Sequence, residues 1–180
     1  MHRFALSAIG RDRPGIVAAV SEALLAHSLN IEDSQATILR GHFTMMLIVA
    51  GAEEIDVATL RQTLEGTARD LGLEAISLNE VTDVEPGPAS VPTHIVTVYG
   101  ADHPGIVHAV ASTLAETEIN ITDLNTRLVG DDDSEDLYAM MIEIALPAGA
   151  SASGLEALLE ATKREQGVEI TVRELEQDAL

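Results

Sequence analysis

Hydrophobic and polar residues alternate along some parts of the chain and follow a helical spacing along others. Alternation favours strands at residues 2–9, 93–99 and 168–172. Spacings of three and four residues favour four helices. Three of them have clear apolar stripes: Ile16, Val20 and Leu24; Val57, Leu60, Leu64 and Leu71; and Ile106, Val110 and Leu114. The fourth helix is expected to start near Ser153.

Short local signals refine these boundaries. Arg40-Gly41 predicts the turn of a hairpin between residues 31–40 and 42–50, with a partner hairpin at 121–129 and 137–146. Gly72 is expected to end the second helix. Pro14 and Pro104 suit the first helical position, and Ser153-Gly-Leu-Glu156 fits a capping box.

An internal repeat organises the whole chain. Residues 10–20 read GRDRPGIVAAV and residues 100–110 read GADHPGIVHAV, which is a shift of 90 positions. Farther along, Phe43-Thr-Met-Met matches Tyr138-Ala-Met-Met at a shift of 95, with the extra residues in the acidic stretch at 131–136. We interpret the chain as a duplication with domains at 1–82 and 93–180, joined by a proline-rich linker at 83–92.

Each half has the element order βαββαβ, which predicts an α+β chain of two ferredoxin-like domains. In each domain we expect an antiparallel sheet with both helices on one face, and we expect the two domains to pack against each other. Pairing would protect exposed sheet edges and create a seam, where small ligands commonly bind.

Composition narrows the function. The net charge is −20, from 30 acidic and 10 basic residues, so direct binding to nucleic acid is not expected. No apolar run approaches the ~20 residues of a membrane helix, and there is no cysteine. We expect a cytoplasmic protein that does not bind membranes. Aromatic residues make up only 2% of the chain, so the core should be aliphatic.

The two halves agree at several positions that are not plainly core, namely Gly10, Asp12, Pro14, Gly15 and Asn30 with their partners at 100, 102, 104, 105 and 120. Asp-x-Pro-Gly lies between a strand and a helix, where free N–H groups and the helix dipole attract a carboxylate. The aspartate would accept a hydrogen bond from an ammonium group, so the parts suit a free amino acid. An alternative is ordinary turn chemistry, with Asn30 in a left-handed conformation after the helix.

Topology puts Asp12 and Asn30 at opposite ends of one repeat. Two repeats packed antiparallel would bring Asn120 near Asp12 and Asn30 near Asp102. We therefore expect two similar sites, each needing both repeats.

The motifs Asp12-Arg-Pro-Gly-Ile-Val and Leu29-Asn-Ile, with Asp102-His-Pro-Gly-Ile-Val and Ile119-Asn-Ile, resemble the ACT domain, a regulatory βαββαβ module. Two copies without an attached enzyme resemble the glycine cleavage system transcriptional repressor group. The resemblance implies amino-acid sensing at a domain interface, a protein partner such as a transcription regulator, and a homodimer. It implies ligand-binding roles for Asp12, Arg13, Gly15, Asn30, Asp102, His103, Gly105 and Asn120.

The sequence gives less support to metal binding or catalysis. The histidines, His2, His27, His42, His94, His103 and His108, lack metal-ligand spacing, and we expect no metal or cofactor. The acidic run at 131–136 lacks the EF-hand pattern and is interpreted as a solvated hairpin tip. Met45, Met46, Met140 and Met141 are assigned to core packing. Catalytic motifs are absent, so we expect no enzyme. The alternative function is a ligand-independent assembly module.

Overall fold

The computed structural model describes residues 2–51, 55–82, 91–129 and 137–175. The chain divides into two compact units, residues 1–84 and 85–180. Each unit is one copy of the repeat. In the described part of the chain, no helix is long and apolar enough to cross a membrane.

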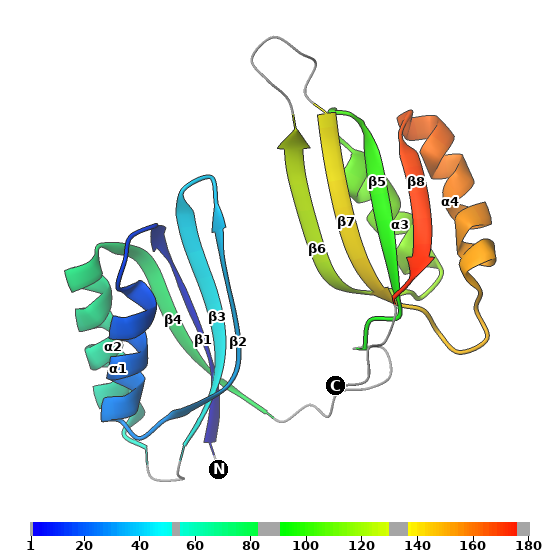
Figure 1. Ribbon diagram of the computed structural model, residues 1–180. Coiled ribbons are helices and arrows are strands. Elements are labelled where there is room, and N and C mark those ends of the chain that lie inside the picture. Colours follow the sequence, from blue (N-terminus) through cyan, green and yellow to red (C-terminus); the bar gives the residue numbers. More distant parts are fainter. Residues whose placement is uncertain (1, 52–54, 83–90, 130–136, 176–180) are drawn as a thin grey trace. The chain divides into compact units, whose positions relative to one another are not determined.

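The first repeat has the predicted order of elements. They are β1 (His2–Arg11), α1 (Ile16–Ala26), β2 (Asn30–Leu39), β3 (His42–Gly51), α2 (Val57–Leu71) and β4 (Leu73–Val81). The four strands pair antiparallel in the order β2-β3-β1-β4. Both helices cover one face of this sheet (Figure 1).

The second repeat has the same architecture. Its elements are β5 (His94–Ala101), α3 (Ile106–Glu116), β6 (Asn120–Val129), β7 (Leu137–Ala145), α4 (Ala152–Gln166) and β8 (Glu169–Glu174). Its strand order is β6-β7-β5-β8 (Figure 1). The prediction of two ferredoxin-like α+β repeats is therefore confirmed.

Each core lies between the sheet and its two helices. In β1 the alternate residues Phe4, Leu6 and Ala8 are buried, and they face buried residues of α1 and α2. The predicted stripes are buried at Ile16, Val20 and Leu24, at Leu60 and Leu64, and at Ile106, Val110 and Leu114. Alternation and helical spacing identify these positions because they report which side of each element faces the core.

The hairpin between β2 and β3 turns at the expected residues. Arg40 and Gly41 have φ angles of 48° and 82°. Two consecutive positive φ angles are typical of a two-residue turn whose twist matches that of the strands.

Three predicted helix starts are wrong. Pro14 and Pro104 do not occupy the first helical position, because Gly15 and Gly105 intervene as the N-cap residues of α1 and α3. In α4 the N-cap is Ser151, whose hydroxyl accepts a hydrogen bond from the Gly154 N–H at 3.1 Å. The predicted capping box at Ser153 is therefore wrong, because the helix is capped two residues earlier and Gly154 has no side chain to complete a box.

The assignment of all four methionines to the core is half wrong. Met45 and Met140 are 2% and 0% exposed, whereas Met46 and Met141 are 54% and 51% exposed. Neighbouring residues of a strand point to opposite sides. Met46 and Met141 therefore lie on the sheet face that the helices leave open. The acidic run at 131–136 and most of the predicted linker lie outside the described residues.

The two adjacent methionines of β3 provide a test of this assignment. Met45→Ala should lower the free energy of unfolding by about 2–5 kcal/mol, because it leaves a cavity in the core. Met46→Ala should change it by no more than about 0.5 kcal/mol. Urea denaturation of both variants measures the difference, and equal losses would contradict the placement of Met46 on the open face.

Candidate functional site

The loop between the first strand and the first helix of each repeat is the feature that the duplication repeats most faithfully. β1 ends at Arg11 and α1 begins at Ile16, while β5 ends at Ala101 and α3 begins at Ile106. The last loop residues, Gly15 and Gly105, have φ angles of 99° and 108°. Only glycine adopts such angles without strain. A Cβ on Gly15 would meet no atom within 4 Å, so the loop is open on that side.

The helices that follow these loops begin without a side-chain cap. In the described part of the chain, no side chain caps the N-terminus of α1 or α3. By contrast, Asp56 caps α2 by accepting hydrogen bonds from the N–H groups of Ala58 and Thr59 at 3.1 Å each. The first-turn N–H groups of α1 and α3 therefore remain available to an external acceptor, and the helix dipole favours an anion there.

The cap of α2 shows what such an N-terminus does to a carboxylate. The Thr59 hydroxyl donates to Asp56 Oδ2 at 2.6 Å. This bond, with the N–H bonds from Thr59 and Ala58, lowers the pKa of Asp56. The contribution of the backbone N–H groups, though not that of the Thr59 hydroxyl, would also favour a carboxylate bound at the uncapped starts of α1 and α3.

In the first repeat, the hairpin tip holds the loop. The Asp12 N–H donates to the Gly41 carbonyl at 2.9 Å. The strand register explains the contact, since Arg11 pairs with His42 at the end of β1. Asp12 and Arg13 are both exposed. Sequence reasoning missed the role of Gly41, although the predicted Arg40-Gly41 turn was the signal for it.

In the second repeat, His103 ties the loop to the end of α4. Its Nε2 lies 2.8 Å from the Gln166 carbonyl oxygen, and its Nδ1 lies 3.2 Å from the Pro104 carbonyl oxygen. The contacts with Gln166 and then Pro104 raise the pKa of His103 above its ordinary value. The sequence repeat pairs His103 with Arg13, but it contained no sign of the contact with Gln166.

Asn30 and Asn120 are exposed residues at the starts of β2 and β6. The interpretation of Asn30 as a left-handed residue after the helix is wrong, because Ser28 and Glu118 take that conformation, with φ angles of 57° and 56°. Just beyond each asparagine the strand register shifts, between Ile31 and Asp33 and at the equivalent point of β6. Such bulges redirect nearby side chains.

A single repeat keeps its aspartate and asparagine apart. Asn30 pairs with Ala50, which pairs with Arg3 near the start of β1. Asp12 follows the other end of β1. From Arg3 to Arg11 at ~3.3 Å per residue, the separation is roughly 26 Å. One amino-acid ligand cannot contact both residues of the same repeat.

Gly10 and Gly100 have a structural explanation. A Cβ on Gly10 would lie 2.9 Å from Leu73 Cδ2, and one on Gly100 would lie 2.8 Å from Val168 Cγ1. These glycines let β1 and β5 approach the residues at the starts of β4 and β8. Their repetition therefore reflects packing and gives no evidence of a ligand.

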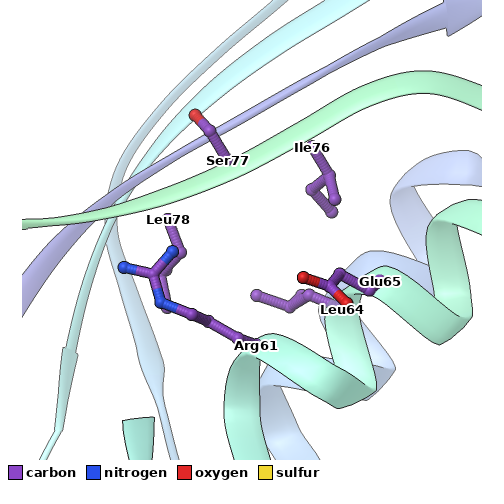
Figure 2. Close-up of a pocket in the computed structure, with 6 residues that line it drawn as sticks. All are labelled: Arg61, Leu64, Glu65, Ile76, Ser77 and Leu78. Carbon is purple, nitrogen blue, oxygen red and sulfur yellow. The ribbon is translucent and has the colours of Figure 1, made fainter. Parts of the chain in front are cut away.

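A pocket between α2 and β4 is lined by the apolar residues Leu64, Ile76 and Leu78 and by the polar residues Arg61, Glu65 and Ser77 (Figure 2). Its volume is about 30 Å³, which suits a water molecule and not an amino acid.

Histidines outside the loops contact polar groups of the fold; for example, His27 Nε2 lies 2.9 Å from Thr63 Oγ1. In the described part of the chain, no group of three potential ligands is placed to hold a metal.

Comparison with known proteins adds independent information. A family model of the ACT domain matches residues 2–76 and again residues 93–173. The chain is 41% identical over 81 residues to the UPF0237 protein of Methanopyrus kandleri, covering 44% of this chain and 90% of that protein. It is 28% identical over 165 residues to the glycine cleavage system transcriptional repressor of Escherichia coli, covering 89% and 83%. The crystal structure of an unknown protein from Galdieria sulphuraria matches with a TM-score of 0.78 and 30% identity, covering 97% and 98%.

The left-handed glycine of the loop can be tested by substitution. Gly15→Ala should lower the free energy of unfolding by about 1–2 kcal/mol, because an L residue is strained at its φ of 99°. Gly66→Ala, inside α2, is the control and should raise it by up to about 1 kcal/mol. Urea denaturation compares the two, and an unchanged Gly15→Ala midpoint would contradict the strained turn.

Proposed function

Because this chain belongs to the ACT domain family, we propose that it is a regulatory protein that binds a free amino acid at its repeated strand–helix loops. The observation that carries the proposal is the uncapped helix start beside an exposed aspartate, present in both repeats. A ligand with both a carboxylate and an ammonium group matches this pair of features.

The chemistry of the loop assigns a role to each part. The ligand carboxylate accepts hydrogen bonds from the first-turn N–H groups of α1 or α3. The ammonium group donates to the carboxylate of Asp12 or Asp102. Gly15 and Gly105 keep the approach to the backbone clear, and Arg13 adds a fixed positive charge in the first loop. We propose His103 as the corresponding residue of the second loop.

We further propose that Asn30 and Asn120 complete sites on a different repeat, in the same chain or in a second copy. Each lies too far from the aspartate of its own repeat to share a ligand with it. β2 forms one edge of its sheet and is exposed at every position, and β6 is exposed at most positions. Association of such edges would protect their unpaired backbone groups and bring loop and asparagine together. A homodimer is one arrangement that achieves this.

We propose that the response passes to a protein partner and that no reaction is catalysed. A net charge of −20 disfavours direct contact with nucleic acid. The Escherichia coli relative carries the name of a transcriptional repressor. By analogy, this chain would act in transcriptional control of amino-acid metabolism through a DNA-binding partner.

A thermal-melt panel tests ligand binding. The common amino acids, glycine and serine included, are added at millimolar concentration. A ligand at ten times its dissociation constant stabilises the folded state by about 1.4 kcal/mol. This corresponds to a rise in Tm of roughly 6–11 °C for domains of this size. If no amino acid shifts the melt, the proposal fails and the ligand-independent assembly module becomes the better function.

Substitutions locate the site. Asp12→Ala and Asn120→Ala should each reduce the ligand-induced shift in Tm, because each removes one side of the same proposed site. Asp70→Ala, an exposed aspartate on α2, is the matched control and should keep the full shift. An undiminished response in both variants would show that the proposed site of Asp12 and Asn120 does not bind the ligand.

A further inference from the structure

We propose that His103 is a positioning residue whose protonated form clasps the strand–helix loop of the second repeat to the C-terminus of α4, so that this loop, unlike its counterpart in the first repeat, responds to pH. The clasp itself is independent of any ligand. Its effect on amino-acid binding rests on the function proposed above.

The two contacts of the His103 ring can both be hydrogen bonds only when each ring nitrogen carries a proton. Nε2 faces the Gln166 carbonyl at 2.8 Å, and Nδ1 faces the Pro104 carbonyl at 3.2 Å. A carbonyl oxygen only accepts hydrogen bonds. Neutral histidine carries one N–H and can satisfy one of the two carbonyls, whereas the imidazolium donates to both. Deprotonation therefore removes one of the two hydrogen bonds.

The contact with α4 joins elements that are distant in the sequence. Gln166 is the last residue of α4, and its carbonyl belongs to the final turn, where carbonyls lack intrahelical partners. The negative end of the helix dipole favours a cation at this point. Gly105 lies on the same side, since a Cβ there would be 3.6 Å from Gln166 Oε1. The imidazolium thus fixes the loop against the helix end.

Some of the neighbouring charged groups favour protonation of His103 and others oppose it. Asp102, in the same loop, favours the imidazolium. On α4, Lys163 opposes it but is paired with Glu169 of β8 at 2.6 Å. Other charged or titratable groups on the neighbouring elements include Arg164, which lies 3.8 Å from Glu160, together with Glu165, His108 and Tyr138. The two carbonyl acceptors are therefore the main reason for protonation.

The same position of the first repeat holds Arg13. The two loops thus both carry a cation when His103 is protonated, but only the second cation can be lost near neutral pH. Both ring nitrogens of His103 are engaged by carbonyls, so its contribution to a ligand is to hold Asp102 and Gly105 in place.

The direction of the pH effect follows from the raised pKa of His103. A histidine whose pKa is higher in the folded than in the unfolded chain stabilises the fold fully below about pH 6.5. This stabilisation is lost as the pH rises through the folded-state value. The second loop should accordingly be held by two His103 hydrogen bonds at low pH and by only one at high pH.

Nuclear magnetic resonance of the full ¹⁵N-labelled chain, without ligand, tests the clasp. Histidine ring signals are followed between about pH 5 and pH 9. The His103 ring should titrate with a midpoint above about 6.5. The backbone amide signals of Gly105 and Gly167 should shift with the same midpoint. Wild-type protein alone provides this measurement, so the test does not depend on a variant folding.

Variants separate the clasp from general effects of pH. His103→Gln and His103→Arg should abolish the titration of the Gly105 and Gly167 signals, the first because it cannot become charged and the second because it stays charged. His108→Gln, in the first turn of α3, is the control and should retain it. A His103 midpoint at or below about 6.5, or amide titration that persists in His103→Gln, would overturn the proposal. If the clasp titrates as expected while no amino acid shifts the melt, the clasp stands and the proposed function falls.

Discussion

The reversal of direction after the first strand is the constraint on which each repeat depends. The chain leaves the centre of the sheet and must enter a helix that packs back on the same face. Gly15 and Gly105 make this turn with φ angles that other residues avoid. The same glycines occupy the N-cap positions of α1 and α3, so the N-cap residue has no side chain with which to cap the helix. The geometry that lets the fold close is therefore also the geometry that leaves the first-turn N–H groups of the helix unsatisfied.

In each repeat, the loop and the asparagine of the candidate site lie at opposite ends of the sheet. The loop follows the last residues of β1, and Asn30 lies beside the first ones. A strand is stiff and long, so local adjustment cannot bring the two together. In the proposed function, duplication would supply a second loop and a second asparagine within one chain, and the exposed edge strand of each repeat would be the surface for association.

The sequence predicted the parts of the fold that depend on which side of an element faces the core. The alternation in β1 and the stripe Ile16, Val20 and Leu24 were sufficient, because burial of apolar side chains determines both. It failed where competing local signals were close together, as at Ser151 and Ser153, since either serine can cap a helix. It also failed for Met46, because an apolar residue is compatible with an open sheet face. Contacts such as His103 with Gln166 were inaccessible to sequence reasoning, because they depend on which loop meets which helix end.

The anchoring of the loop differs between the copies and has a consequence for how each repeat opens. In the first repeat the loop is tied through Asp12 to the Gly41 turn, and in the second it is tied through His103 to the last turn of α4. Segments joined in this way tend to unfold together as one cooperative unit. Local opening in the first repeat should therefore couple the loop to its hairpin, whereas local opening in the second should couple the loop to its final helix. Two copies of one ancestral unit would then share a fold while differing in the partial unfolding that each undergoes most readily.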